Sequence, residues 1–322
     1  MEKYVFSGSL TNRMHDILKA MPGFEPLNIL VTQVDRSGVK QAIKYKQEGF
    51  CKWFFLDSGA FSIHTGKAKT TIDEYIDFIN SIDEYVDVCA ELDTIPGKFG
   101  QPKSKEDYEE SAKKSWEAYL YMRSKLKSPK KVMPVFHYGE SFDALKNMLE
   151  WKDENGEHLD YIGISPANDV SQGLKNIYMN EVRSIIEASS NPKVKTHLYG
   201  MTSLDALSKY ECYSADSISH RHIAAYCKIW SRNFGVISVS KKQRTSSHKN
   251  DLSFLDTADE YNLNKLKEEA AEMGLTLEQL EEDSSARVAF NMYNIQKMIN
   301  EGGKFEYKET NLKKPKRLVS ID

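Results

Sequence analysis

The chain has 322 residues, of which 40% are hydrophobic and 28% are charged. This is an ordinary globular composition, and it excludes a largely disordered chain, a collagen-like fibre and a disulfide-dense miniprotein. The formal net charge is -3, from 44 basic and 47 acidic residues. That balance argues against a protein that coats nucleic acid by charge alone, but it allows an enzyme with a local basic groove.

No apolar run approaches the roughly 18 residues that a membrane span needs, and the N-terminus has no signal-peptide core. We therefore expect a soluble, cytoplasmic protein with no membrane contact. The cysteines are Cys51, Cys89, Cys212 and Cys227, and they form neither a CxxC pair nor a cluster with zinc-ligand spacing. We expect reduced thiols, mostly buried, and no metal site.

Short apolar runs alternate with amphipathic stretches along most of the chain, without internal repeats. The runs have strand length and are rich in Val, Ile, Phe or Tyr, and they cover residues 28–34, 52–58, 87–93, 131–137, 160–166, 195–201, 213–219 and 234–240. The intervening stretches 71–85, 104–127, 141–154, 176–190 and 203–210 predict helices, with Ser141 and Ser203 as N-caps.

This alternation predicts an α/β fold with a parallel sheet, and eight strands that are each followed by a helix predict a (β/α)8 TIM barrel. A doubly wound open sheet is the alternative. The weakest predicted strand is 213–219, because its polar residues would be costly in a barrel core. We expect residues 1–250 to form the barrel domain.

The pattern changes after residue 250. Residues 256–273 predict an acidic helix with Asp256 or Thr257 as its cap, and 276–299 predict one or two more helices that begin at Thr276. Residues 251–322 are therefore expected to be a C-terminal helical extension with a basic tail. The basic cluster at 313–317 either is solvated or contacts nucleic-acid phosphates.

Polar side chains crowd the C-terminal ends of several predicted strands. Asp57, Asp93, His137 and Asp216 all stand at such ends. Barrel active sites lie at that rim, so these acids and the histidine predict a catalytic site there. Gly59, which follows Asp57 closely, allows a ligand to approach the backbone.

Residues 57–61 (Asp-Ser-Gly-Ala-Phe) resemble the Asp-Ser-Gly-Gly-Phe signature of tRNA-guanine transglycosylases. Further segments follow in the family's order. Residues 135–139 lie where the family has Val-Gln-Gly-Gly, and 162–165 lie where it has Ala-Leu-Gly-Gly. Residues 197–204 resemble its Leu-x-Gly-(Val/Ile)-Gly stretch, and 214–217 lie where the family has Gly-Val-Asp shortly before its nucleophilic aspartate. The resemblance covers residues 50–240.

The sequence differs from the tRNA-guanine transglycosylases at several motifs, and these differences indicate which branch of the family it resembles. The zinc-binding Cys-x-Cys-x-x-Cys and His motif of the bacterial enzymes is missing, and we expect no cofactor and no archaeal RNA-binding domain. A gapless alignment places the nucleophile opposite Ser219, with Asp216 as the nearest carboxylate. This pattern is most similar to the DpdA proteins of phages and bacterial islands, which insert 7-deazaguanine derivatives into DNA in place of guanine.

The resemblance implies a pentosyltransferase that exchanges guanine in DNA for a base such as 7-cyano-7-deazaguanine. Asp216 would be the nucleophile that forms a covalent glycosyl-aspartate intermediate, and Asp57 would be the general acid and base. The reverse assignment of the two carboxylates stays open. If the chain is phage-encoded, it would act in the host cell cytoplasm.

Recognition of the base needs acceptors for the donors at N1 and N2 of guanine. Asp93 is expected to supply them, with Glu91 as the alternative, while His137 is expected to bind the carbonyl. Phe61 and Tyr199 are expected to stack on the base, with plain core packing as the alternative. The remaining expected base-binding residues are Ser58, Gly59, Gly163, Ser165 and Gly200.

A target base must be flipped out of a duplex or presented in a single strand, and its phosphates need cations. Arg221 and the acid-free segment 241–249 are expected to supply them, the latter through Lys241, Lys242, Arg244 and Lys249. A solvated loop is the alternative for that segment.

Four further possibilities stay open at this stage. The enzyme could act on tRNA in place of DNA, or the chain could be a non-catalytic, transglycosylase-like subunit that binds nucleic acid. An unrelated barrel enzyme, such as an aldolase or a glycosidase, is the third. The resemblance also leaves a homodimer open.

Overall fold

The computed structural model describes residues 1–166, 170–201, 209–240 and 252–301. The chain divides into two compact units. The first comprises Met1–His15 and Phe24–Ser219, and the second comprises Asp16–Gly23 and His220–Asp322. The sequence placed this division after residue 250.

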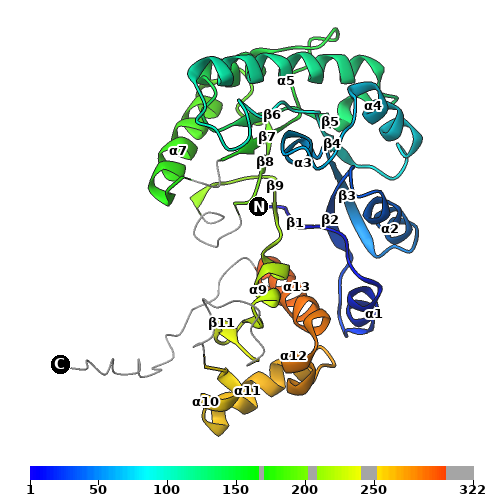
Figure 1. The fold of residues 1–322 in the computed structure, drawn as a ribbon, viewed down its shortest axis with the longest axis vertical. Coiled ribbons are helices and arrows are strands. Elements are labelled where there is room, and N and C mark those ends of the chain that lie inside the picture. The colour runs from blue at the N-terminus through cyan, green and yellow to red at the C-terminus, as the bar shows by residue number, and fades with distance from the viewer. Residues whose placement is uncertain (167–169, 202–208, 241–251, 302–322) are drawn as a thin grey trace, which may run out of the picture. The chain divides into compact units, whose positions relative to one another are not determined.

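The first unit is built on one parallel sheet in the order β5-β4-β3-β2-β1-β9-β8-β7-β6 (Figure 1). Its strands are β1 (Lys3–Ser7), β2 (Leu27–Thr32), β3 (Cys51–Asp57), β4 (Val88–Ala90), β5 (Val132–Met133), β6 (Val135–His137), β7 (Tyr161–Ser165), β8 (Lys195–Leu198) and β9 (Ser214–Ser217).

Pro134 joins the two ends of this sheet, because it alone separates β5 from β6. With β5 and β6 counted as one strand, the nine strands become eight, and the sheet is a nearly closed barrel of the predicted (β/α)8 class. Proline has no N–H to give to the ladder. Next to it, the buried Glu91 carboxyl accepts a hydrogen bond from the Val135 N–H at 2.9 Å, so the backbone stays satisfied at the join.

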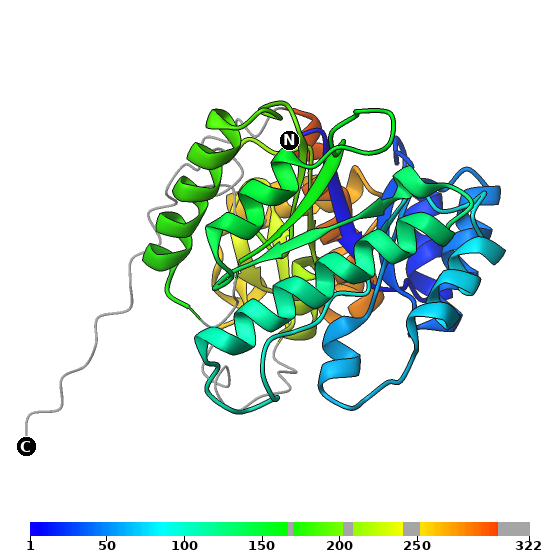
Figure 2. The same cartoon turned by 90° about the horizontal axis from the view of Figure 1, so that it is seen from above.

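Helices follow the strands and lie outside them, as Figure 1 and the view in Figure 2 show in blue to green. They are α1 (Asn12–Ala20), α2 (Arg36–Gln47), α3 (Ala60–His64), α4 (Ile72–Ser81), α5 (Lys105–Lys125), the short η1 (Pro129–Lys131), α6 (Phe142–Glu150) and α7 (Gln172–Ala188). Ser141 caps α6 as predicted, and α5 begins with a capping box at Ser104. The predicted cap Ser203 lies outside the described residues.

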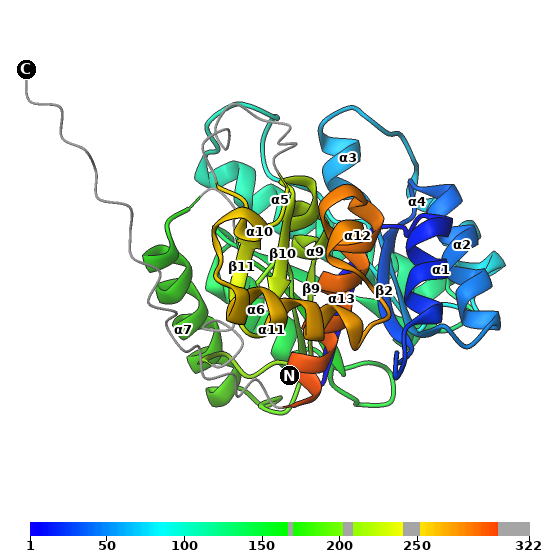
Figure 3. The same cartoon turned by 90° about the horizontal axis from the view of Figure 1, so that it is seen from below.

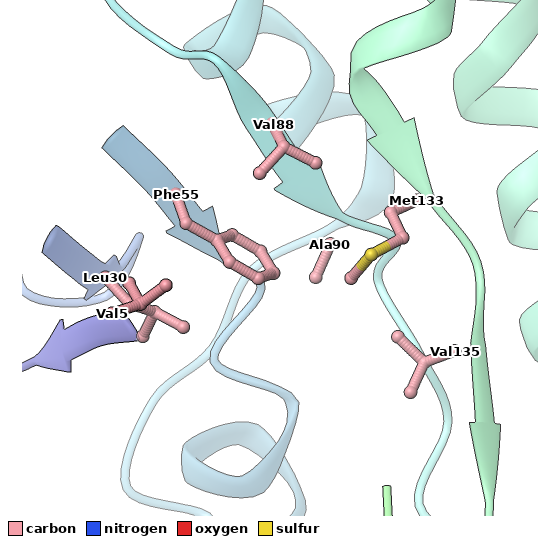
Figure 4. Close-up of a cluster of buried hydrophobic side chains, with 7 residues drawn as sticks. All are labelled: Val5, Leu30, Phe55, Val88, Ala90, Met133 and Val135. Carbon is pink, nitrogen blue, oxygen red and sulfur yellow. The ribbon is translucent and has the colours of Figure 1, made fainter. Parts of the chain in front are cut away.

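The barrel interior contains a cluster of buried apolar side chains. Figure 4 shows the cluster, with the Phe55 ring pointing between side chains of neighbouring strands. Its members are Val5, Leu30, Phe55, Val88, Ala90, Met133 and Val135, and Trp53, Tyr161 and Tyr199 pack against it. This core holds in place the strand ends that carry the polar residues.

One strand prediction was wrong, and one barrel strand was not predicted. Residues 234–240 do not form a barrel strand, because β11 (Gly235–Ser238) pairs antiparallel with β10 (Lys228–Ser231) in a separate sheet. The barrel strand missing from the prediction is β1, which pairs with both β2 and β9. An antiparallel pair and a parallel barrel strand are built from the same β-branched and aromatic residues, so composition alone does not distinguish them.

The polar strand at 213–219, predicted to be the weakest, does lie in the barrel as β9, between β1 and β8. Its buried Ser214 is hydrogen-bonded to His197 and to Tyr161. These hydrogen bonds pair the Ser214 hydroxyl inside the barrel, which removes most of the cost of burying it.

The second unit combines the β10–β11 pair with helices, drawn in yellow to orange in Figure 3. The helices are α9 (Ser219–Ala225), α10 (Phe254–Thr257), α11 (Glu260–Ala271), α12 (Leu277–Glu282) and α13 (Ser284–Asn300). Buried Glu269 accepts hydrogen bonds from Ser231 and from the Arg232 N–H, at 2.6 and 2.7 Å. C-terminal helices are thus present as predicted.

The helix caps of this unit agree with the prediction in one case and differ in another. Thr276 caps α12 with a capping box, as predicted. The acidic helix begins later than predicted and is capped by Asp259, since Thr257 ends the separate helix α10. Asp259 accepts a hydrogen bond from the Asn262 N–H at 2.8 Å.

We expect Phe55→Ala to lower the free energy of unfolding by about 3 to 5 kcal/mol, because it leaves a cavity in the fully buried cluster. Urea unfolding followed by circular dichroism measures the change. Phe99→Ala, at a ring that is 63% exposed, is the matched control and should change the stability little. Equal losses in the two variants would contradict this assignment of the core.

Candidate active site

A cavity of about 840 Å³ opens in the first unit where the barrel strands end. It is lined by residues within or after β3, β6 and β7, by residues after β4 and β8, and by Asp216 of β9. Nine of the predicted site residues line it, namely Asp57, Ser58, Phe61, Asp93, His137, Ser165, Tyr199, Gly200 and Asp216. Barrel closure therefore brings together residues that are far apart in the sequence.

The Asp-Ser-Gly segment after β3 folds as a tight turn. The Gly59 N–H donates to Asp57 Oδ2 at 3.1 Å, and the Ala60 N–H donates to Ser58 Oγ at 3.2 Å. Gly59 has a φ of +74°, and a Cβ there would lie 2.6 Å from Thr32 Oγ1. Only glycine fits this position, which explains the residue that follows Asp57 and Ser58.

His137 is held between two carboxylates. Its Nε2 lies 3.0 Å from Asp93 Oδ2, and its Nδ1 lies 3.1 Å from Glu140 Oε1. Burial lowers the pKa of His137, but hydrogen bonds to Asp93 and Glu140 and their charges outweigh it and raise the pKa to about 10. His137 is therefore an imidazolium at neutral pH, with both N–H groups engaged by protein carboxylates.

Asp93 is in turn fixed by a second donor. Ser58 Oγ donates to Asp93 Oδ1 at 2.8 Å, while His137 engages Oδ2. The Asp93 side chain is 12% exposed, so it can still meet a ligand in the cavity. Its two hydrogen bonds set the direction in which the remaining lone pairs point.

Asp57 holds its proton more firmly than an ordinary aspartate. Burial and the charges of Asp93 and Asp216 raise the pKa of Asp57 to about 7, although the Gly59 N–H and Thr32 favour the ionised form. Near neutral pH the carboxyl is divided between its two protonation states. It can thus give or take a proton without a large cost.

Asp216 is held from three sides. Ser7 Oγ donates to Oδ2, the Gly200 N–H donates to Oδ1 at 3.2 Å, and His197 Nε2 lies 3.3 Å from Oδ1. Since a carboxylate only accepts, His197 Nε2 carries the ring proton in this pair. These contacts fix the carboxylate while 13% of the side chain stays exposed to the cavity.

The contact to His197 continues into the barrel as a chain of hydrogen bonds. His197 Nδ1 accepts from Ser214, and Ser214 in turn accepts from the Tyr161 hydroxyl. His197 is fully buried, so its tautomer is set by these partners and not by solvent. The sequence prediction did not assign His197, although it lies within the segment that resembles the family.

Tyr199 lies among the three aspartates of the cavity. Burial raises the pKa of its hydroxyl well above the usual value, and the charges of Asp57, Asp93 and Asp216 raise it further. In the described part of the chain the buried hydroxyl has no hydrogen-bond partner. It is therefore a neutral donor that a ligand in the cavity can engage.

Three predicted base-binding residues do not line the cavity. Glu91 is fully buried, binds the Val135 N–H, and burial raises its pKa well above the usual value. Gly59 shapes the turn described above. Gly163 makes room for the Tyr199 ring, because a Cβ there would lie 2.9 Å from Tyr199 Cε2.

The predicted phosphate contacts have different outcomes. Arg221 lies half-buried in α9. Lys241, Lys242, Arg244 and Lys249 lie outside the described residues, as does the basic cluster at 313–317. Phosphate contact by the segment 241–249 was predicted because a barrel strand at 234–240 would place that segment at the barrel rim. The strand belongs to the β10–β11 pair, so this reason no longer holds.

The sequence analysis missed Glu140 and the rim residues of the loop that follows Asp93. Glu140 is 1% exposed and holds His137, and its only signal was its place three residues after that histidine. Lys98, Phe99 and Lys103 line the mouth of the cavity. An exposed loop has no hydrophobic period that would single out such residues.

Other predictions concern groups outside the cavity. All four cysteines are free and buried, as predicted. In the described residues no group of three or more His, Cys, Asp and Glu side chains is arranged to hold a metal ion. Within the same part of the chain, no helix has both the length and the apolar character of a membrane span.

Neither a protein-family model nor a curated protein sequence matches this chain.

We expect His137 to remain doubly protonated at neutral pH and to lose a ring proton only near pH 10. Nuclear magnetic resonance of its ring nitrogens measures this titration. Glu140→Gln should shift the midpoint to lower pH, because it removes one of the charges that stabilise the imidazolium. Asp143→Asn, at an exposed acid of α6, is the control, and an equal shift in that variant would contradict the stabilisation of the imidazolium by Glu140.

Proposed function

We propose that this protein exchanges guanine in DNA for a 7-deazaguanine base through a covalent glycosyl-aspartate intermediate. The observation that carries the proposal is that Asp57 and Asp216 line one cavity but differ in their surroundings. Asp57 has a pKa of about 7, whereas Asp216 is fixed by donors from three segments. Two carboxylates with divided roles are what a double displacement at a sugar carbon needs.

In the first step an Asp216 oxygen bonds to C1′ of the target nucleotide as the bond from C1′ to guanine N9 breaks. The electron pair of that bond leaves with guanine, and Asp57 gives its proton to the departing base. Guanine then leaves neutral, and Asp57 is left as a carboxylate. The three hydrogen bonds to Asp216 keep one oxygen directed at the sugar.

In the second step the incoming base gives its N9 proton to Asp57. The nitrogen then bonds to C1′ as the ester bond to Asp216 breaks, and the electron pair returns to the Asp216 carboxylate. Asp57 is again protonated, so the enzyme regains its starting state and the configuration at C1′ is retained. A pKa near 7 suits a group that must donate in one step and accept in the next.

Recognition of the base would rest on Asp93. Its carboxylate is held by Ser58 and His137, and its free lone pairs suit the N1 and N2 donors that guanine and 7-deazaguanine share. His137 has both ring nitrogens engaged, so in this proposal it orients Asp93 and does not bind the base carbonyl. The unpartnered Tyr199 hydroxyl is a donor for that carbonyl.

The choice of DNA over tRNA is supported by the sequence. The zinc motif of the tRNA enzymes is absent, and the motifs are most similar to the DNA-modifying branch.

We expect purified protein, given DNA and 7-cyano-7-deazaguanine, to yield a modified deoxynucleoside after digestion and mass spectrometry. Single-stranded and duplex DNA and tRNA are tested in parallel. Asp216→Asn should reduce the yield at least about 100-fold, because the amide cannot serve as the nucleophile. Asp143→Asn is the control for an exposed aspartate. Modification of tRNA alone would move the protein to the tRNA branch, and no product from any substrate would contradict the exchange.

We expect the two half-reactions to depend on pH in opposite directions. Asp57 acts as an acid in guanine release, which should slow as the pH rises through about 7. It acts as a base in capture of the incoming base, which should slow as the pH falls through the same value. Single-turnover release and capture of labelled bases measure the two rates. Profiles that run in the same direction would contradict the role of Asp57.

A further inference from the structure

Two phenyl rings stand in solvent at the mouth of the cavity. Phe61 of α3 and Phe99 of the loop 95–103 are each 63% exposed, and their ring centroids lie 6.4 Å apart in an edge-to-face arrangement. The His64 ring lies 6.1 Å from Phe99. Single exposed apolar residues are common in proteins, but paired rings beside a cavity mark a binding surface more often.

A tight turn in the loop 95–103 exposes the Phe99 ring to solvent. The Gln101 N–H donates to the Lys98 carbonyl at 3.1 Å, which closes a turn with Phe99 at its second position. Gly100 follows with a φ of +77°, the left-handed conformation that the third position of a type II turn requires. The turn fixes the backbone on both sides of the ring, so little conformational freedom is lost when a ligand covers it.

The same turn carries positive charge. Lys98 and Lys103 flank Phe99, are exposed, and line the cavity mouth. In the described part of the chain neither lysine has a carboxylate partner within ion-pair distance, while Lys103 Nζ lies 6.0 Å above the Tyr108 ring. Deeper in the cavity the charge is reversed, because Asp57, Asp93 and Asp216 lie there. The two lysines and the Phe99 ring therefore lie at the cavity mouth, and the aspartates lie inside the cavity. This arrangement fits a ligand whose phosphates stay at the mouth while its base enters the cavity.

We propose that Lys98, Phe99 and Lys103, here called the aromatic lip, bind the nucleotide next to the target guanine in a DNA strand. The Phe99 ring stacks on that neighbouring base, and the lysines contact its flanking phosphates. This inference rests on the proposed function. A base that leaves the stack exposes the face of its neighbour, and an aromatic ring with cations beside it is the usual surface for such an unstacked strand.

The first test is binding of a fluorescent single-stranded oligodeoxynucleotide with one guanine, without any incoming base. We expect Phe99→Ala to raise the Kd by roughly 5- to 150-fold, because base stacking on an aromatic side chain is lost. Phe99→Tyr should bind like the natural protein, whereas Phe99→Leu should remain weak because it keeps apolar area but no flat ring. Ile177→Ala, at a side chain of α7 that is 66% exposed, is the matched control.

The second test is the salt dependence of the same binding. Lys98→Ala and Lys103→Ala should each reduce the slope of log Kd against log salt by about 0.7, the value for one phosphate contact to a single strand. Lys113→Ala, at an exposed lysine paired with Glu117 on α5, should leave the slope unchanged. Photocrosslinking with 5-iododeoxyuridine next to the guanine should label Phe99.

The outcomes separate this inference from the proposed exchange. In one outcome the natural protein catalyses exchange while Phe99→Ala binds as before and the lysine variants keep their salt slopes. That result would overturn the proposed role of the aromatic lip and leave the proposed function standing. Binding that depends on Phe99, without any exchange, would support the lip and contradict the proposed function. Tighter binding of an RNA strand with the same sequence would overturn the assignment of the lip to DNA.

Discussion

The crowding of carboxyl groups at one barrel rim is the constraint on which the rest of the site depends. Asp57, Asp93 and Asp216 line one cavity, and carboxylates this close cannot all be ionised without compensation. Two features of the site offset this repulsion between carboxylates. Asp57 has a pKa raised to about 7, and His137 is kept protonated between Asp93 and Glu140. The crowding thereby gives Asp57 and His137 pKa values above their ordinary ones.

The barrel makes this crowding possible. Each acid stands at or near the end of a different strand. Pro134 separates the two strands at the ends of the sheet, and Glu91 binds the neighbouring Val135 N–H. The apolar cluster around Phe55 fixes the strands, while Ser214, His197 and Tyr161 carry polar contacts through the interior to Asp216. The packed strands and these hydrogen bonds hold the carboxylates in place around the cavity.

Sequence reasoning predicted the fold class and nine of the residues that line the cavity, because both follow from local patterns. Asp57, Asp93, His137 and Asp216 could be found since each follows a strand-like run. The strand at 234–240 was misplaced because an antiparallel pair has the same composition as a barrel strand. Glu140 and Phe99 were missed because their importance depends on three-dimensional neighbours and not on periodicity.

The most direct test of the account is to identify the residue that holds the sugar. The natural protein, incubated with guanine-containing DNA at a pH below 7 without an incoming base and then digested with protease and nuclease, would be analysed by peptide mass spectrometry. The account predicts a glycosyl adduct on the peptide that contains Asp216, because Asp57 is protonated below its pKa of about 7 and can release guanine, while no incoming base displaces the ester. An adduct on any other residue, or an adduct that persists in Asp216→Asn, would contradict it.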